Sequence, residues 1–94
     1  MGKLVRDRIP ELFGGYSQTL DEPGFRAALR DKLQEEVTEY LESGDPPELA
    51  DVLEVVYALA DLDGVSPTRL EEMRARKAAE RGGFGKRLWW EASD

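Results

Sequence analysis

Proline and glycine divide this chain into three long segments, and their positions constrain the fold more than any other feature. Each long segment has a proline near its start, where a helix does not need the missing N–H, and a glycine after its end, where a left-handed residue stops a helix. The predicted helices cover 23–43, 45–63 and 66–81, after a short turn at 9–13. Strand-like patterns are confined to 3–5 and 87–90, so we expect an all-α fold.

The chain is short for an independent core. At 94 residues it is below the size at which proteins divide, so we expect residues 1–94 to form a single domain. Surface scaling gives about 15,000 Å² for the unfolded chain and about 5,500 Å² for a compact monomer, so association of several copies would help to stabilise it. The tail, 84–94, holds Trp89 and Trp90 and is too apolar for water, and we expect it to pack on the core or on a neighbouring subunit.

Missing residue types narrow the possible chemistry. The chain has no cysteine and no histidine, which excludes thiolate nucleophiles, Cys/His zinc sites and histidine general bases.

Its net charge of −7 argues against non-specific binding to nucleic acid or to an anionic membrane, and makes a cation the more natural ligand. No apolar run approaches the roughly 20 residues of a membrane span, and no signal-peptide core follows Met1, so we expect a cytoplasmic protein.

Acidic residues fall on the apolar faces of the first two long helices. The predicted apolar stripes consist of Phe25, Leu29, Leu33, Val37, Tyr40 and Leu41 in the first helix, and Leu49, Val52, Leu53, Val55, Val56, Leu59 and Ala60 in the second. At about 100° per residue, Glu36 lies inside the first stripe. The acids at the borders are Glu35 and Glu39 on the first helix and Glu48 and Asp51 on the second. A buried carboxylate needs a positive partner, because it loses several kcal/mol of hydration.

The tight connection brings these acids level with one another. At 1.5 Å per residue, Glu39 lies about 6 Å before the end of its helix and Glu48 about 4.5 Å after the start of the next. Glu36 and Asp51 lie roughly one turn further from the connection, so antiparallel packing would gather all four carboxylates. Four carboxylates without imidazole or thiolate favour Mg²⁺, or Mn²⁺, over zinc or copper.

Each acid also has an ordinary structural interpretation. Glu35 and Glu36 could be solvated residues that pair with Lys32 on the same helix. Glu48 could be the acid of a capping box that begins at Asp45.

Because bound Mg²⁺ commonly meets phosphate groups, basic residues should converge on the same site. The candidates are Lys3, Arg6 and Arg8 near the N-terminus, Arg74, Arg76, Lys77 and Arg81 in the third helix, and Lys86 and Arg87 after it. The alternative is that the cations of the third helix complement its C-terminal end and pair with its own acids.

Four motifs carry a resemblance to a known family. They are KLVRDRIP at 3–10, EEVTE at 35–39, ELAD at 48–51, and Lys77 followed by RGGF at 81–84. Together they span nearly the whole chain and resemble the MazG-like all-α nucleoside triphosphate pyrophosphohydrolases. The most similar branch contains small proteins related to phosphoribosyl-ATP pyrophosphohydrolase.

The resemblance implies an enzyme and assigns roles to the motif residues. It implies a MazG-like helical bundle in which an antiparallel helix pair carries the acids. It also implies Mg²⁺-dependent hydrolysis of nucleotides between the α- and β-phosphates, in nucleotide clean-up. The implied metal ligands are Glu36, Glu39, Glu48 and Asp51, the implied catalytic residue is Glu35, and the implied phosphate contacts are Lys3, Arg6, Lys77 and Arg81. Glu35 would orient water or a second ion. The family's subunits associate as homodimers or dimers of dimers.

Two departures leave the substrate open. Only residues 40–47 separate Glu39 from Glu48, so a substrate-covering loop found in relatives is missing, and the chain has no asparagine to contact a nucleotide. One alternative is an enzyme that acts on phosphoribosyl-ATP. The other is a non-catalytic helical adaptor that keeps the scaffold and binds a partner through Trp89 and Trp90.

Overall fold

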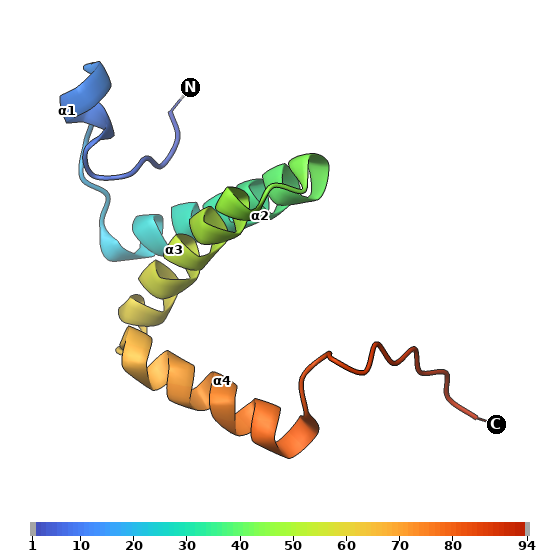
Figure 1. The fold of residues 1–94 in the computed structure, drawn as a ribbon. Coiled ribbons are helices and arrows are strands. Elements are labelled where there is room, and N and C mark those ends of the chain that lie inside the picture. Colours follow the sequence, from blue (N-terminus) through green and yellow to red (C-terminus); the bar gives the residue numbers. More distant parts are fainter. Residues whose placement is uncertain (1, 94) are drawn as a thin grey trace.

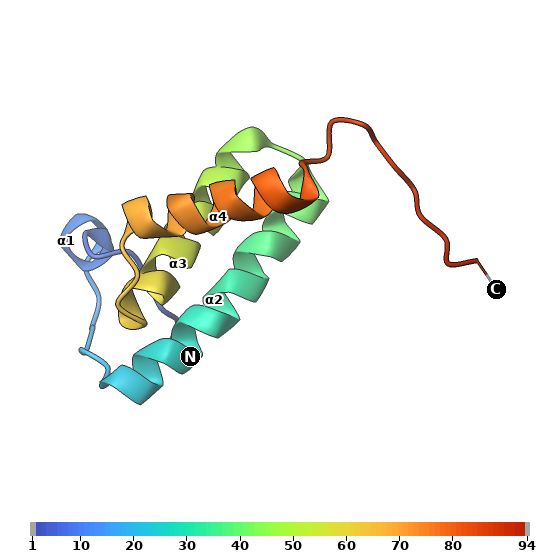
Figure 2. The ribbon, with the colours of Figure 1, turned by 90° about the horizontal axis from the view of Figure 1, so that it is seen from below.

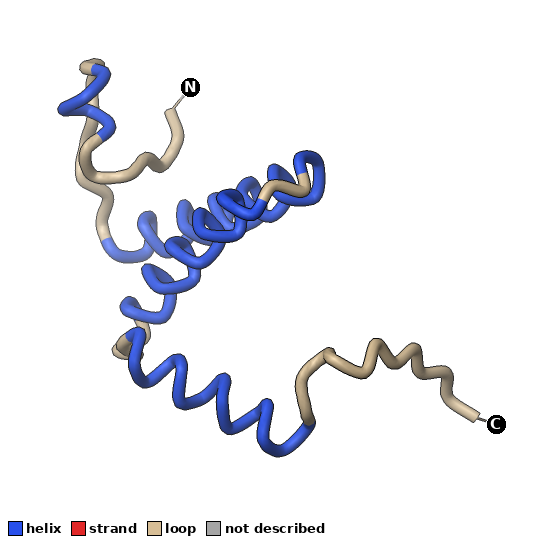
Figure 3. The backbone as a smooth tube through the Cα atoms, viewed as in Figure 1, coloured by secondary structure: helices blue, strands red, loops and turns tan. Residues whose placement is uncertain are grey.

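Four α-helices form the protein in the computed structural model, which describes residues 2–93 (Figure 3). They are α1 (Ile9–Phe13), α2 (Glu22–Ser43), α3 (Pro46–Leu62) and α4 (Pro67–Arg81). The described range contains no strand, which confirms the all-α prediction. The two predicted strand pieces, at 3–5 and 87–90, are wrong, because both segments are irregular and neither has a neighbouring strand to pair with.

Local capping groups fix where α2 and α4 begin and where α2 ends. The Asp21 carboxylate accepts a hydrogen bond from the Gly24 amide at 2.8 Å, and the Ser66 hydroxyl accepts one from the Arg69 amide at 3.1 Å. Each bond satisfies an amide that has no partner inside its helix. Gly44 ends α2 in the left-handed conformation, with φ of 70°, as its position after the last helical residue predicts.

The start of α3 differs from the predicted capping box. The Asp45 side chain makes no capping hydrogen bond. Pro46 and Pro47 supply no amide hydrogen, and the Glu48 amide donates to the Asp45 backbone carbonyl at 3.0 Å. No free amide is left for the Asp45 side chain, and the Asp45 amide, from which a capping acid would accept, donates to the Ser43 hydroxyl at 3.1 Å, so Glu48 does not act as a capping acid.

Helices α2 and α3 form an antiparallel hairpin, and this hairpin positions the acidic residues (Figure 1). At the open end of the hairpin, an Arg26 guanidinium nitrogen lies 3.0 Å from an Asp63 carboxylate oxygen and ties the start of α2 to the end of α3. Helix α4 turns away after Asp63, and of the other described helices it packs only against α3. Seen from below, the segment after α4 runs out beyond all the helices (Figure 2).

The single chain has a very small interior. Within residues 2–93 the buried residues are Leu29, Val55 and Glu36. The accessible surface of 8474 Å² exceeds the roughly 5,500 Å² of a compact protein of this mass. The radius of gyration of 17.0 Å likewise exceeds the roughly 12 Å of a compact domain.

Several residues of the predicted apolar stripes are exposed, which corrects the prediction that the stripes are buried. Leu41 is 75% exposed, and the others with substantial exposure are Val37, Leu49 and Leu53. One hairpin can cover only one side of each helix, so the broad stripes extend beyond the contact. The tail does not pack on the core of its own chain, since Trp89 is 88% and Trp90 83% exposed. Asp94, the last residue of that predicted segment, lies outside the described residues.

None of the helices in the described range combines the length and the apolar character needed to cross a membrane.

Candidate metal centre

Glu36 is the buried acid at the centre of the site. Only 7% of the residue is exposed, and it lies on the side of α2 that meets α3. Its Oε1 atom is 3.3 Å from the Lys32 ammonium nitrogen, whereas its Oε2 atom is buried and has no hydrogen-bond partner. An unsatisfied buried acceptor costs about 1–3 kcal/mol, so the site is incomplete without a further positive or hydrogen-bonding group.

Two groups of carboxylates share Glu36. In the first, oxygens of Glu36, Glu48 and Asp51 all lie within 4.8 Å of one another across the two helices. In the second, oxygens of Glu35, Glu36 and Glu39 lie within the same distance along α2. The structure therefore gathers all five acids singled out from the sequence, as two overlapping triads that join at the buried residue.

Helical geometry explains both groups. Residues three and four apart lie on one side of a helix, which brings the α2 acids together and places Glu48 beside Asp51 on α3. The connection between the helices consists of Gly44 and Asp45, so the last turns of α2 and the first turns of α3 lie level with each other. Glu36 then meets the α3 pair directly.

Mutual repulsion among the acids appears in their pKa values. The pKa of Glu39 is raised above 4.5, first because its protonated carboxyl group can donate a hydrogen bond to Glu36 and then because of the charge on Glu36. The pKa of Glu48 is also raised, by desolvation first and by the charge of Asp51 next. A raised carboxyl pKa means that the surroundings disfavour another negative charge, which is the environment that attracts a cation.

Two side chains of the protein partly neutralise the cluster. The Lys32 ammonium nitrogen is 3.3 Å from oxygens of both Glu35 and Glu36. Burial lowers the pKa of Lys32, but its bonds to these two acids outweigh that effect and raise it. The predicted alternative, in which Lys32 pairs with these acids, is therefore present.

Arg6 supplies the second cation. It donates a hydrogen bond to Asp51 at 2.7 Å, and another of its nitrogens lies 3.6 Å from Glu54. This contact brings the N-terminal segment against α3 at the acidic cluster. Two cations thus face five clustered carboxylates, which leaves a net charge of −3 on the cluster, and within residues 2–93 no ion pair reaches Glu39 or Glu48.

The remaining predicted phosphate contacts lie elsewhere. Among residues 2–93, no ion pair or hydrogen bond joins Lys3, Lys77 or Arg81 to the acids of the cluster. Lys77 and Arg81 belong to α4, which diverges from the hairpin (Figure 1).

Two other cations of α4 pair within their own helix. Arg74 donates to Glu71 at 2.6 Å, and Arg69 donates to Glu72 at 3.2 Å. The bond from Arg74 lowers the pKa of Glu71. For Arg74 the structure agrees with the alternative in which cations of this helix pair with its own acids.

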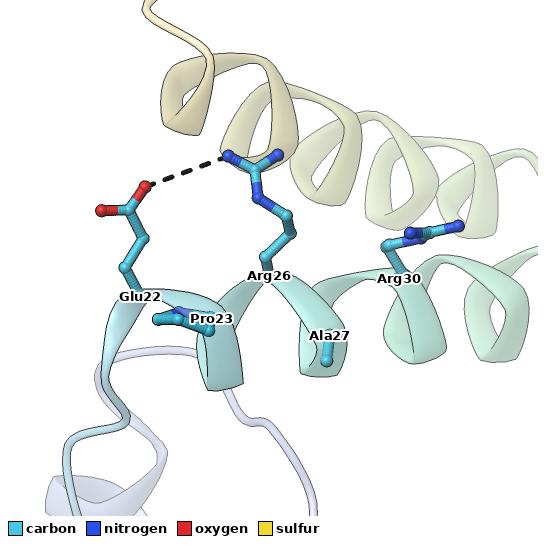
Figure 4. A pocket seen from close by; sticks show the side chains of 5 residues that line it. All are labelled: Glu22, Pro23, Arg26, Ala27 and Arg30. Carbon is cyan, nitrogen blue, oxygen red and sulfur yellow. Dashed lines mark ion pairs between the residues drawn. The ribbon is translucent and has the colours of Figure 1, made fainter.

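Sequence reasoning missed a second polar region, along the first turns of α2. A shallow hollow there is lined by Glu22, Pro23, Arg26, Ala27 and Arg30 (Figure 4). Arg26 reaches Glu22 at 3.9 Å in addition to Asp63, so its charge is already paired. The spacing of four residues between Arg26 and Arg30 is the sequence signal for two cations on one helix side.

Comparison with known proteins identifies no relative, since no family model, curated protein or solved structure matches the chain.

Proposed function

We propose that the acidic cluster of the α2–α3 hairpin binds a divalent cation, Mg²⁺ or Mn²⁺. The observation that carries the proposal is the Oε2 atom of Glu36, which is buried and has no partner. Glu48 and Asp51 on the facing helix would complete the set, with Glu35 and Glu39 beside it.

The donor atoms fit such an ion. All are carboxylate oxygens, the ligands that hard cations prefer, and neither imidazole nor thiolate is present to favour zinc or copper. Around Mg²⁺ at 2.0–2.1 Å, adjacent ligand oxygens lie about 2.9 Å apart and opposite ones about 4.2 Å apart. Oxygens within 4.8 Å of one another need only a small side-chain movement to reach these separations.

The activity that we propose for this site is nucleotide pyrophosphohydrolysis, which gives a nucleoside monophosphate and pyrophosphate. The resemblance of the motifs around Glu36 and Asp51 to the MazG-like enzymes supports it. A bound Mg²⁺ ion would supply Lewis acidity toward phosphate oxygens. Glu35, at the edge of the cluster, would orient the attacking water and accept its proton.

Cations would hold the phosphates. Arg6 is already at the cluster and has five N–H donors, of which the bond to Asp51 uses only part. Lys3, Lys77 and Arg81 are the further proposed contacts. For Lys77 and Arg81 to take part, α4 or a second copy of the chain would have to bring them to the hairpin.

A homodimer or a dimer of dimers is part of the proposal. The small interior and the exposed apolar residues support it, because a single chain leaves far more surface in water than a stable domain of this size does.

The test combines metal binding with pyrophosphate release. Purified protein is titrated with Mg²⁺ and Mn²⁺ by calorimetry, and is assayed against nucleoside triphosphates and phosphoribosyl-ATP. We expect Asp51→Asn to abolish both metal binding and turnover. Glu54→Gln is the matched control, since Glu54 also pairs with Arg6 and lies outside both triads.

Three outcomes separate the candidate functions. Turnover of nucleoside triphosphates supports the proposal, and turnover of phosphoribosyl-ATP alone supports the biosynthetic alternative. If the protein shows no metal binding and no turnover, the enzyme proposal is overturned and the helical adaptor is favoured. The exposed Trp89 and Trp90 would suit an adaptor.

A further inference from the structure

The segment after α4 has the properties of a docking arm. We define the C-terminal arm as residues 82–93, which follow α4 without forming a helix or strand. Its four large apolar side chains are more than four-fifths exposed: Phe84, Leu88, Trp89 and Trp90. In both views the arm runs away from the helices of its own chain (Figures 1 and 2). Apolar side chains of this size are rarely left together in water.

The hairpin carries an unpartnered apolar surface that could receive such an arm. We call Val37, Leu41, Leu49 and Leu53 the hairpin apolar face, and all four are exposed. At 100° per residue, Val37 and Leu41 lie about 100° and about 140° round α2 from Glu36. Leu49 and Leu53 lie about 120° and about 160° round α3 from the buried Val55, in the same rotational sense.

Val37 and Leu49 lie on one side of the hairpin, and Leu41 and Leu53 lie further round, on the outer flanks of α2 and α3 that border this side. Two facing antiparallel helices wind in opposite senses when both are viewed from one end, so equal rotations away from the contact lead to the same side of the pair. Glu39 and Asp51 lie at the opposite rotation, about 60° from Glu36 and about 40° from Val55. The hairpin apolar face is therefore distinct from the acidic cluster.

The exposed area is large enough for a stable contact with a second copy. The accessible surface exceeds that of a compact chain by about 3,000 Å². Three aromatic side chains and a leucine bury about 800 Å², or about 1,600 Å² when the surface they cover is included. Reciprocal exchange would bury this area on each partner, and about 800 Å² per partner is sufficient for a stable interface. The course of the arm away from the helices of its own chain favours a second copy over an arm that folds back.

We propose that the C-terminal arm of one copy lies on the hairpin apolar face of a second copy, and that the exchange is reciprocal. A two-fold dimer places each arm on the same surface of its partner. The proposal goes beyond the metal site and does not depend on it, so the two can fail separately.

Tryptophan fluorescence reports on the arm alone, because the two tryptophans of the chain are Trp89 and Trp90. Serial dilution is followed in parallel by emission wavelength and by sedimentation. We expect the emission maximum to shift to longer wavelength over the same concentration range in which the dimer dissociates. Emission that stays shielded after sedimentation shows that the dimer has dissociated would show that the arm folds back on its own chain. Emission that is exposed at every concentration would show that the arm is free, and either result overturns the proposal.

Disulfide trapping locates the contact. Because the chain has no cysteine, only the introduced thiols can form disulfides. Leu88→Cys and Leu49→Cys are made in separate proteins of different mass, mixed and oxidised. We expect the mixed disulfide between Leu88→Cys and Leu49→Cys to form at least about tenfold faster than the mixed disulfide between Leu88→Cys and Leu12→Cys, which is the control pair. Equal rates for the two pairs would overturn the proposal. So would a disulfide that forms only within one chain when Leu88→Cys and Leu49→Cys are combined.

Substitution in the arm measures its contribution. We expect Trp89→Ser with Trp90→Ser to raise the dimer dissociation constant by at least about 100-fold, since buried aromatic residues dominate interfaces. Tyr16→Ser is the control, because Tyr16 is an exposed aromatic residue outside the arm. An unchanged dissociation constant for the double variant would overturn the proposal, and trapping still decides the question if that variant fails to fold.

Discussion

Replacing Glu36 with glutamine should make the protein more stable than the wild type without Mg²⁺ and less stable than the wild type with Mg²⁺. Glutamine has nearly the same shape as glutamate but no charge. In the metal-free protein it relieves the unsatisfied Oε2 atom, because the new amide can donate to Glu48 or Asp51, which lie within 4.8 Å. Its carbonyl oxygen can still accept from Lys32, and Lys32 keeps its bond to Glu35. We therefore expect Glu36→Gln to stabilise the metal-free protein.

The magnitude follows from the cost of the unsatisfied oxygen. That cost is about 1–3 kcal/mol, and the weakened ion pair with Lys32 offsets part of it, which leaves a net gain of about 1 kcal/mol. For a domain of this size the gain raises Tm by about 4–8 °C. In Mg²⁺ at 100 times the dissociation constant, the wild type gains about 2.7 kcal/mol and the variant gains nothing. The wild type should then be the more stable by about 1.7 kcal/mol.

Thermal unfolding at one fixed protein concentration, with Mg²⁺ and with EDTA, measures this reversal. Glu42→Gln is the control, because Glu42 is an exposed glutamate on the same helix and lies outside both triads. A Glu36→Gln protein that is less stable than wild type in EDTA would refute the reasoning, since Glu36 would then act as a structural partner of Lys32. A wild type that Mg²⁺ does not stabilise would refute the metal site itself.

Three further predictions test the cluster and the hairpin. Because the folded-state pKa values of Glu39 and Glu48 lie above 4.5, the folded metal-free protein binds protons more tightly than the unfolded chain. Its free energy of unfolding should rise as the pH falls from above these two pKa values toward 4.5. The Mg²⁺ affinity measured by calorimetry should fall over the same pH range, because protons compete with the ion for the carboxylates. The opposite trends would contradict the placing of Glu39 and Glu48 in the metal site. Arg6→Gln should change the free energy of unfolding by less than about 1 kcal/mol, because the ion pair with Asp51 is exposed. It should tighten Mg²⁺ binding by about two- to fivefold, because the cation that competes for Asp51 is gone. Weaker Mg²⁺ binding in calorimetry would argue that Arg6 positions Asp51. Gly44→Ala should lower Tm by about 4–8 °C, because a left-handed alanine costs about 1 kcal/mol; an unchanged melting curve would contradict this.

Helix boundaries could be predicted from the sequence because local residues set them. Asp21 and Ser66 cap helices with their own side chains, and Gly44 stops a helix through its own backbone. The same local rule failed at Asp45, where two consecutive prolines remove the amides that a cap needs. The inward position of Glu36 was predictable from helical periodicity alone, and its burial confirms that prediction.

Burial and long-range contacts were harder to predict. Leu41 and Leu53 have the spacing of core residues, but burial requires a surface to pack against, and the chain offers none to them. The contact between Arg6 and Asp51 depends on the path of the N-terminal segment, which no periodic pattern specifies. Lys77 and Arg81 of α4 were expected to contact the substrate phosphates because of the motif resemblance. Whether they reach the acidic cluster depends on the direction of α4, which tertiary packing sets and the local sequence does not.

The two-residue link between α2 and α3 has a kinetic consequence. Closing so short a loop costs little chain entropy, and contacts between neighbouring helices form early in folding. The carboxylates from both helices therefore meet through a local event, before distant parts of the chain or other molecules need to arrive. The proposed cation site therefore needs only this hairpin to form, and its acids can come together early in the folding of one polypeptide.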